Sequence, residues 1–387
     1  MWHSGYMALP RAETVGSLLR PEYLKQAREA RLAEQLSADE LEAIEDRAVR
    51  EAIGMQERVG LDVITDGEMR RQSWITTIPI VADRLHPAPL TGYQYRVPEQ
   101  PGWFAFWRDD SGQFVRFRAN VPRAFVTDKL RYAHDLVGRE FPFLKAHARA
   151  RTKYSLPAPS YHRVFWHPEY SRAAYPTVDE FLADVTALLR QHVLQPLIEH
   201  GCDYIQLDAP NYGQFYVDAD VRQVLEQEGH DLDAELLADA ELDSAAFEGL
   251  NGVTRAVHVC RGNGPGGIWS ASGGYEPLGP AFQRLRNIDT LLLEYDTDRA
   301  GEFAPLRHVR PNTTVVLGLL TTKRGALEAT DALTKRVHEA EQHVPLERLA
   351  ISPQCGFNSA GIGNSLTYEE QEAKLRRVSE VAQRLWP

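Results

Sequence analysis

The chain has 387 residues, and its 43% hydrophobic and 25% charged content is typical of a folded globular protein. A net charge of −11 argues against a nucleic-acid partner, because such binding depends on Lys and Arg neutralising phosphates. No stretch approaches the roughly 20 apolar residues that cross a bilayer, and the N-terminal segment lacks the apolar core of a signal peptide. We therefore expect a cytoplasmic protein with a small-molecule ligand and no membrane partner.

Short apolar runs alternate with helical patterns along the whole chain. The predicted strands cover residues 14–17, 62–67, 152–158, 204–209, 254–260, 290–295, 313–320 and 349–354. Strands that alternate with helices predict a parallel sheet, and eight such units favour a closed (β/α)₈ barrel of the TIM type over an open doubly wound sheet. We expect one α/β catalytic domain over residues 1–387.

Helix starts are marked by a hydroxyl residue followed three positions later by a glutamate. This capping pattern occurs at Ser37-x-x-Glu40, Thr177-x-x-Glu180 and Thr367-x-x-Glu370. After the first of them, apolar residues recur every three or four positions, namely Leu41, Ile44, Ala48, Ala52, Met55 and Val59. Such a stripe predicts a helix with one face in the core.

The interval between the second and third predicted strands, residues 85–150, is too long for an ordinary crossover. It contains alternating apolar residues, a Ser-Gly turn and the aromatic residues Trp103, Phe104, Phe106 and Trp107. We interpret it as an inserted β-hairpin subdomain. It could serve as a lid, as a contact between copies in a homo-oligomer, or as a plain surface elaboration.

His258-Val259-Cys260 is the sharpest local motif, because residues i and i+2 of a strand project to the same face. Cys355 and Glu294 end two other predicted strands, and in a barrel the carboxyl ends of the strands form the catalytic face. Two thiolates with an imidazole and a carboxylate favour Zn²⁺ over Mg²⁺ or Ca²⁺. The alternatives are cysteines that act as small core residues, and Asp296 or Asp298 in place of Glu294.

The remaining cysteine, Cys202, is interpreted as structural, and three cysteines are too few for a disulfide framework. Two thiolates and one carboxylate around Zn²⁺ would leave the site with a charge of about −1. A substrate thiol could then bind as a thiolate and keep its nucleophilicity. The predicted chemistry is attack of that thiolate on an activated carbon.

Ordered motifs across most of the chain resemble the C-terminal catalytic barrel of cobalamin-independent methionine synthase. They are Thr14-Val15-Gly16-Ser17, Gly60-Leu61-Asp62-Val63, Asp66-Gly67-Glu68, Ile205-Gln206-Leu207-Asp208, His258-Val259-Cys260, Leu293-Glu294 and Pro353-Gln354-Cys355-Gly356. The resemblance implies methionine biosynthesis, with a methyl group passing from a methylated pterin to homocysteine. It implies that zinc is held by His258, Cys260, Glu294 and Cys355, and homocysteine by Val15, Gly16, Ser17, Glu68 and Asp208.

The chain departs from this family on the side of the methyl donor. It is too short for the second, N-terminal barrel of the full-length enzymes, Ala209 and Gln214 stand where carboxylates are expected, and residues 319–323 contain no histidine. The donor is therefore open: a methylated pterin, a corrinoid or another compound. Trp166 could stack on a planar donor or simply pack in the core.

Other assignments remain open for the two carboxylates and for the reaction. Glu68 could form an ion pair with Arg70 or Arg71, and Asp208 could cap the turn that follows it. The chain also resembles epoxyalkane:coenzyme M transferase in length and zinc pattern. A sulfonate thiol would need cations, for which the candidates are Arg20, Arg70 and Arg163, whereas Glu68 and Asp208 favour an amino thiol. A structural zinc site and a decarboxylase are the remaining alternatives.

Overall fold

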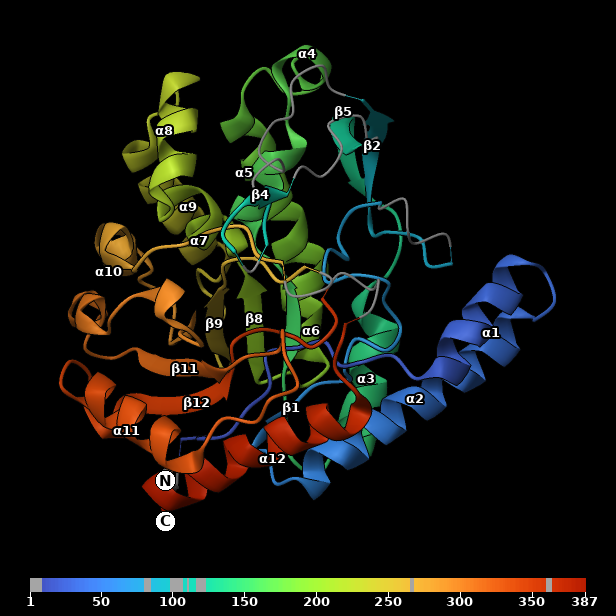
Figure 1. The fold of residues 1–387 in the computed structure, drawn as a ribbon. Helices are drawn as coiled ribbons and strands as arrows, with labels where there is room; N and C mark the ends of the chain where they lie inside the picture. The colour runs from blue at the N-terminus through green and yellow to red at the C-terminus, as the bar shows by residue number, and fades with distance from the viewer. Residues whose placement is uncertain are drawn as a thin grey trace, which may run out of the picture.

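Strands and helices alternate along this computed structural model, which describes residues 9–79, 85–97, 107–109, 111–115, 123–264, 268–359 and 364–387 (Figure 1). The strands are β1 (Val63–Ile64), β2 (Leu90–Arg96), β3 (Trp107–Arg108), β4 (Phe114–Val115), β5 (Arg123–Tyr132), β6 (Arg151–Thr152), β7 (Tyr154–Pro157), β8 (Tyr204–Asp208), β9 (Thr254–Val259), β10 (Thr290–Glu294), β11 (Thr314–Leu320) and β12 (Leu349–Pro353). The helices are α1 (Glu22–Leu32), α2 (Ala38–Arg58), α3 (Val137–His147), α4 (Pro168–Ser171), α5 (Val178–Leu189), α6 (Gln195–Glu199), α7 (Pro210–Tyr216), α8 (Ala219–Gln227), α9 (Leu232–Ala246), α10 (Gly279–Arg284), α11 (Thr330–Glu341) and α12 (Tyr368–Leu385).

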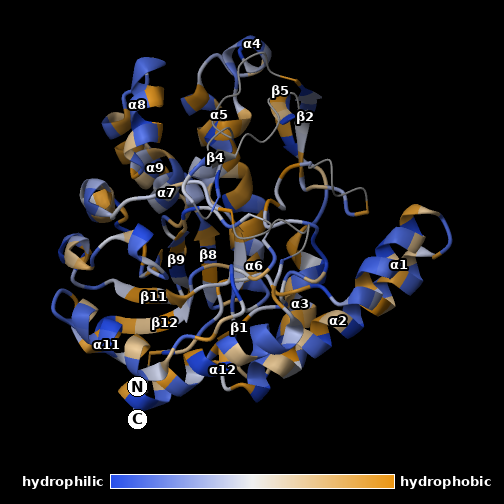
Figure 2. Ribbon diagram, viewed as in Figure 1, coloured by the Kyte–Doolittle hydropathy of each residue, from blue (hydrophilic) through white to orange (hydrophobic). Residues whose placement is uncertain are grey.

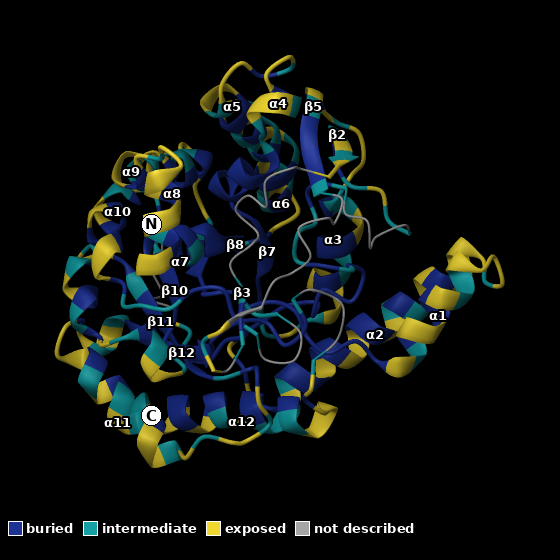
Figure 3. Cartoon of the chain, turned by 45° about the horizontal axis from the view of Figure 1, so that its top comes forward, coloured by how far each residue is buried: buried dark blue, intermediate teal, exposed yellow. Residues whose placement is uncertain are grey.

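A six-stranded parallel sheet in the order β12-β11-β10-β9-β8-β7 forms the centre of this mixed α/β fold. Its strands are almost wholly buried, as the dark blue centre of Figure 3 shows. Strands buried on both faces consist of continuous apolar runs rather than alternating ones, and the sequence TVVLGLL of β11 is an example. Parallel pairing brings all six carboxyl ends to one side of the sheet, which is where the candidate site lies.

Single parallel bridges connect the start of the described chain to its last strand and to β1. Ala12 pairs with Ile351 of β12, Glu13 pairs with Val63 of β1, and β1 in turn pairs with β6. The predicted strand at 14–17 is wrong, because pairing occurs at Ala12 and Glu13 and the chain then turns away. The predicted strand at 62–67 is reduced to two residues, and the turn after it needs Gly67 at a φ of 69°.

Apolar side chains gather in two clusters on the two sides of the strands. The larger cluster lies between the strands and the surrounding helices, which keep polar residues outside (Figure 2). The smaller one contains Val15, Val63, Tyr204, Ala256, Leu292, Val316 and Ala350. Its members come from β1, β8, β9, β10, β11, β12 and the segment beside Glu13, so five of the six strands of the central sheet contribute to it.

The predicted helix starts at Ser37, Thr177 and Thr367 are confirmed. Ser37 and Thr367 each form a complete capping box with the glutamate three residues on, and the Thr177 hydroxyl accepts the Glu180 N–H. No described helix is both long and apolar enough to cross a membrane.

The long interval after β1 contains two antiparallel pairs, β2 with β5 and β3 with β4. The predicted Ser-Gly turn joins β3 to β4, with Gly112 at a φ of 81°. Arg108 forms a bridge with Trp269, so this segment contacts the loop that follows β9. Of the four aromatic residues named above, Trp103, Phe104 and Phe106 lie outside the described residues.

Candidate metal and substrate site

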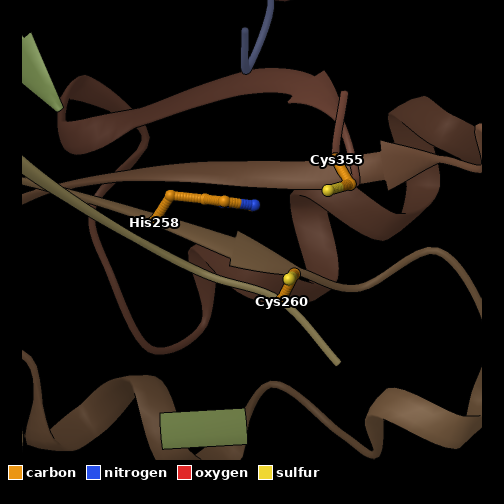
Figure 4. Close-up of side chains that lie close together, drawn as sticks. All are labelled: His258, Cys260 and Cys355. Atoms are coloured by element: carbon orange, nitrogen blue, oxygen red, sulfur yellow. The ribbon is translucent and has the colours of Figure 1, made fainter. Parts of the chain in front are cut away.

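His258, Cys260 and Cys355 converge at the carboxyl ends of the central strands. Their ligand atoms all lie within 4.8 Å of one another, and all three residues are buried. His258 and Cys260 come from the end of β9, whereas Cys355 follows β12. Figure 4 shows the three side chains directed toward one point. The i, i+2 pattern therefore places an imidazole and a thiol as predicted, and a distant strand end supplies the second thiol.

The imidazole of His258 is oriented for ligation through Nε2. Its Nδ1 lies 3.3 Å from the carbonyl oxygen of Leu292, and donation of an N–H there puts the lone pair on Nε2. Nε2 itself is buried and has no hydrogen-bond partner in the part of the chain that the structure describes. A buried acceptor without a partner, beside two sulfur atoms, is the arrangement that a soft divalent metal such as Zn²⁺ satisfies.

The two thiols influence each other strongly. The hydrogen bond from Cys260, together with the neighbouring His258, holds the pKa of Cys355 well below its usual range. The same hydrogen bond and burial raise the pKa of Cys260 well above its usual range. Cys355 is therefore the more readily ionised sulfur of the pair, and the thiolate is the form in which a cysteine binds a metal.

Glu294, the fourth predicted ligand, is buried among cations. Its Oε2 accepts the backbone N–H of Arg261 at 2.7 Å, and its Oε1 lies 2.6 Å from Arg299 Nη2 and 3.5 Å from Lys323 Nζ. Burial alone would raise its pKa, but Lys323, Arg299 and Arg261 outweigh that effect and lower it to about 2. The three-residue group of ligand atoms includes neither Glu294 nor its alternatives Asp296 and Asp298.

A cavity of about 240 Å³ opens directly onto the three clustered side chains. Its wall includes His258, Cys260 and Cys355, and also the predicted substrate residues Val15, Gly16, Ser17, Glu68 and Asp208. The structure thus brings together eight of the ten residues proposed from the sequence. Glu294 is not part of the wall. Trp166 is also absent from it, because its indole N–H is donated to the carbonyl of Tyr175 at 3.1 Å.

Glu68 faces the cavity with an unusual backbone conformation and an unsatisfied carboxylate. It has a φ of 56°, Ser155 donates to its Oε1 at 3.3 Å, and its Oε2 has no hydrogen-bond partner among the described residues. Burial raises its pKa to about 7, although Arg71 and Arg20 oppose the rise. A methyl group on Gly16 would lie only 2.9 Å from Oε1, so this approach depends on glycine.

The alternative roles of the two carboxylates are not seen. Arg70 pairs with Asp46 and Arg71 with Glu140, whereas the ion-pair partner of Glu68 is Arg20 at 3.7 Å.

Asp208 does not cap α7, because its Oδ1 accepts the side-chain N–H of Gln206 at 2.7 Å. Asp208 is paired in register with His258, and burial raises its pKa to about 6.

Aromatic side chains line the rest of the cavity, and the sequence did not identify most of them. Trp74, Trp107, Tyr161 and Phe215 all contribute to its wall. Trp74 follows β1, Trp107 belongs to the inserted segment, and Tyr161 lies in the 3₁₀ helix η2 (Pro159–Phe165). Because these positions lie outside the long periodic elements, no spacing in the sequence points to a shared surface.

Known proteins similar to this chain cover most of its length. The family model "Cobalamin-independent synthase, Catalytic domain" matches residues 10–88 and 176–384. The uncharacterized protein YxjH of Bacillus subtilis is 34% identical over 380 residues, which are 97% of this chain and 94% of YxjH. A methionine synthase of Pyrococcus horikoshii is 24% identical, with 91% and 88% covered. A solved structure of a candidate vitamin-B12 independent methionine synthase from Listeria monocytogenes matches with a TM-score of 0.72 and 28% identity, covering 98% of this chain and 99% of that one.

Proposed function

Because the chain belongs to the cobalamin-independent synthase family, we propose that it is a zinc-dependent methyltransferase acting on homocysteine or a similar amino thiol. The observation that carries the proposal is the position of the His258, Cys260 and Cys355 group at the wall of a cavity that also contains two buried carboxylates. The methyl donor is a methylated pterin or another methylated compound.

The metal would be held by Nε2 of His258 and by the sulfur atoms of Cys260 and Cys355, with Glu294 as the proposed fourth ligand. Two sulfur ligands and one imidazole suit Zn²⁺ better than the cations that prefer oxygen. When bound, zinc lowers the pKa of a coordinated substrate thiol, so that the thiol reacts as a thiolate at neutral pH. Glu294 is ionised already, so joining the metal requires only its separation from Arg299 and Lys323.

The amino and carboxyl groups of the acceptor are assigned to opposite parts of the wall. Glu68 and Asp208 would take the ammonium, since both are buried carboxylates on the cavity wall and Oε2 of Glu68 has no hydrogen-bond partner among the described residues. The backbone turn Val15–Ser17 would take the carboxylate. This arrangement fixes the thiol end of the molecule toward the two cysteines, which is the positioning that an in-line transfer needs.

A sulfonate thiol such as coenzyme M fits this cavity less well. Of the three arginines considered for it, none lines the cavity. Arg70 is paired with Asp46, Arg163 with Asp239, and Arg20 with Glu68. Epoxyalkane:coenzyme M transfer therefore remains only as the alternative that the acceptor experiment below must exclude.

We also propose that the parallel strands close into one TIM-type barrel and that residues 85–150 form a lid within this single domain. Support for closure comes from the two bridges at Ala12 and Glu13 and from the inner apolar cluster. Support for the lid comes from Trp107, which lines the cavity, and from Arg108, which contacts Trp269 and forms ion pairs with Asp218 and Asp220. A lid would account for both contacts.

The proposal is tested by replacing zinc with Co²⁺ and recording the thiolate-to-metal absorption during thiol titrations. Homocysteine should change the spectrum and coenzyme M should not. A response to coenzyme M alone would contradict the amino-thiol assignment.

Metal content provides the companion measurement. Cys260→Ser and Cys355→Ser should each lower bound zinc by at least tenfold, in line with the loss of a thiolate ligand. Cys202→Ser is the matched control, because Cys202 is equally buried but donates its S–H to the carbonyl of Tyr204. If all three variants retain zinc, the metal site is not at these cysteines.

A further inference from the structure

The wall of the candidate cavity combines aromatic rings with negative charge. Its charged side chains, apart from the clustered His258, are Glu68 and Asp208, and the described lining residues include neither Lys nor Arg. Among the buried arginines that lie outside this wall, Arg71 pairs with Glu140 and Arg163 with Asp239, whereas Arg20 pairs with Glu68 at 3.7 Å. A donor with phosphate, sulfonate or several carboxylates would be repelled here, whereas a cation would be attracted.

Two of the aromatic rings that line the cavity pack against each other. Trp74 and Tyr161 have ring centroids 4.7 Å apart at an interplanar angle of 56°. The backbone N–H of Trp74 is donated to the carbonyl of Ser359, whose hydroxyl lies 3.6 Å from the sulfur of Cys355. Tyr161 lines the same cavity as Cys260 and Cys355. A group resting on this ring pair therefore lies in one cavity with both thiols.

We propose that the alkyl donor is an onium compound, a sulfonium or a quaternary ammonium, whose charged head rests on the rings of Trp74 and Tyr161, in a cavity whose described wall includes neither Lys nor Arg. Aromatic faces attract such cations, and the attraction grows when water is excluded. The role of the onium compound as alkyl donor rests on the proposed thiol alkylation. Binding of an onium cation at this site does not depend on that reaction.

The transfer balances without an additional reactant. The thiolate sulfur of the acceptor forms a bond to the methyl carbon, while the bond from that carbon to the positively charged sulfur or nitrogen breaks. The electron pair of the broken bond stays on the leaving atom, so a neutral thioether or tertiary amine departs. No proton has to be supplied to the leaving group, and Tyr161 keeps its proton throughout.

Binding is tested on the zinc-loaded protein without any thiol, by calorimetry and by the fluorescence of the tryptophans. The probes are choline and its neutral carbon isostere 3,3-dimethylbutan-1-ol, with inorganic phosphate as the anionic probe. Choline should bind at least tenfold more tightly than the isostere, and phosphate should not compete. Equal affinity for the two isosteres, or tighter binding of phosphate, would overturn the onium site.

Substitutions locate the cation. Trp74→Leu should weaken choline binding about tenfold, and Trp74→Phe should restore most of it because a ring is retained. Trp166→Leu is the matched control, since that half-buried tryptophan lies outside the cavity wall and should leave choline affinity unchanged. Unchanged choline binding in folded Trp74→Leu, judged by circular dichroism, would place the cation elsewhere and refute the proposal.

Transfer is then followed by mass spectrometry with homocysteine and deuterated trimethylsulfonium or tetramethylammonium. Deuterated methionine from either compound supports the onium donor, and the one that reacts identifies the leaving atom. If the Co²⁺ protein responds to homocysteine but neither onium compound is consumed, the donor assignment fails while the thiol proposal stands. If homocysteine causes no response and choline still binds, the proposed function fails and the cation site remains.

Discussion

Glu68 combines three features that are costly for a folded protein. Its left-handed backbone is rare for a residue with a side chain, its carboxylate is 98% buried, and one carboxylate oxygen has no hydrogen bond among the described residues. Strain and unsatisfied polar groups of this kind cluster at functional sites, where the surrounding structure enforces them. The ammonium group of an amino thiol would supply the missing partner.

The raised pKa of Glu68 makes acceptor binding dependent on pH. Because that pKa is about 7, the carboxylate is ionised above neutrality and becomes protonated below it. Homocysteine affinity should therefore fall by up to about tenfold per pH unit as the pH drops below 7. The measurement is a Co²⁺ spectral titration between pH 5.5 and 8.5, and Glu68→Gln should remove the part of the dependence that Glu68 contributes.

A control is needed because thiol deprotonation has the same direction of pH dependence. The compound 4-mercaptobutyrate has the thiol and carboxylate of homocysteine and lacks the amino group. Its affinity should show only the thiol contribution, so the two titrations should diverge below pH 7. Parallel curves for both compounds would remove Glu68 from the ammonium site.

The sequence predicted which residues lie together best where those residues share one strand. His258 and Cys260 share a strand face by spacing alone, and the side chains that line the cavity include all the substrate residues proposed except Trp166. The sequence could not show that Trp74, and not Trp166, lines the cavity. Which aromatic rings meet depends on how the loops fold in three dimensions. Trp74 reaches the site through its backbone contact with Ser359, which is 285 positions away.

Helix α9 shows how a whole element holds the cavity wall. Asp239 accepts from Arg163 and Tyr216 at 2.6 Å each, and Asp243 accepts from Ser160 and Tyr212. These contacts anchor both η2, which contains Tyr161, and α7, which contains Phe215. One helix with two buried carboxylates thus fixes two segments that would otherwise depend on apolar packing alone.

Removing the charge of Asp239 should be strongly destabilising. In Asp239→Asn the guanidinium of Arg163 stays buried without its main counter-charge, which should lower the free energy of unfolding by about 3 kcal/mol in urea titrations. The control lies on the same helix: Glu241 pairs with Arg284 at the surface, so Glu241→Gln should cost under about 1 kcal/mol. Similar small losses in both variants would show that the buried network contributes little.

The sequence predicted the positions of those strands that are both buried and paired in the central sheet. The predictions at 204–209, 254–260, 290–295, 313–320 and 349–354 each differ from β8 to β12 by one residue at most at either end. Near the N-terminus the pattern failed, because the segment 14–17 (Thr-Val-Gly-Ser) is buried and partly lines the cavity but does not form a strand. Hydropathy predicts that this segment is buried. Its backbone pairing, however, depends on β12, which lies more than 300 residues away in the sequence.

A buried ion pair between Lys153 and Glu13 links segments that lie far apart in the sequence. Lys153 donates to Glu13 at 2.5 Å and to the carbonyl of Thr14 at 2.6 Å, and the hydroxyl of Tyr204 lies 3.2 Å from Glu13. These contacts join the first described segment, the stretch between β6 and β7, and β8. These three segments are far apart in the sequence, so the ion pair favours one arrangement of the segments relative to one another.

Closure of the barrel is testable because a closed sheet has no free edge. The N–H of Ile351 is donated to Arg11 and that of Lys153 to Ile64, so both amides should exchange with solvent as slowly as those of β9 and β10. Hydrogen exchange read by mass spectrometry with residue-level fragmentation measures this. Glu13→Gln should speed exchange at both amides by weakening the ion pair with Lys153, whereas Glu22→Gln, at an exposed pair with Lys25, should not. Fast exchange of Ile351 and Lys153 in the unsubstituted protein would instead indicate an open sheet whose edges are β12 and β7.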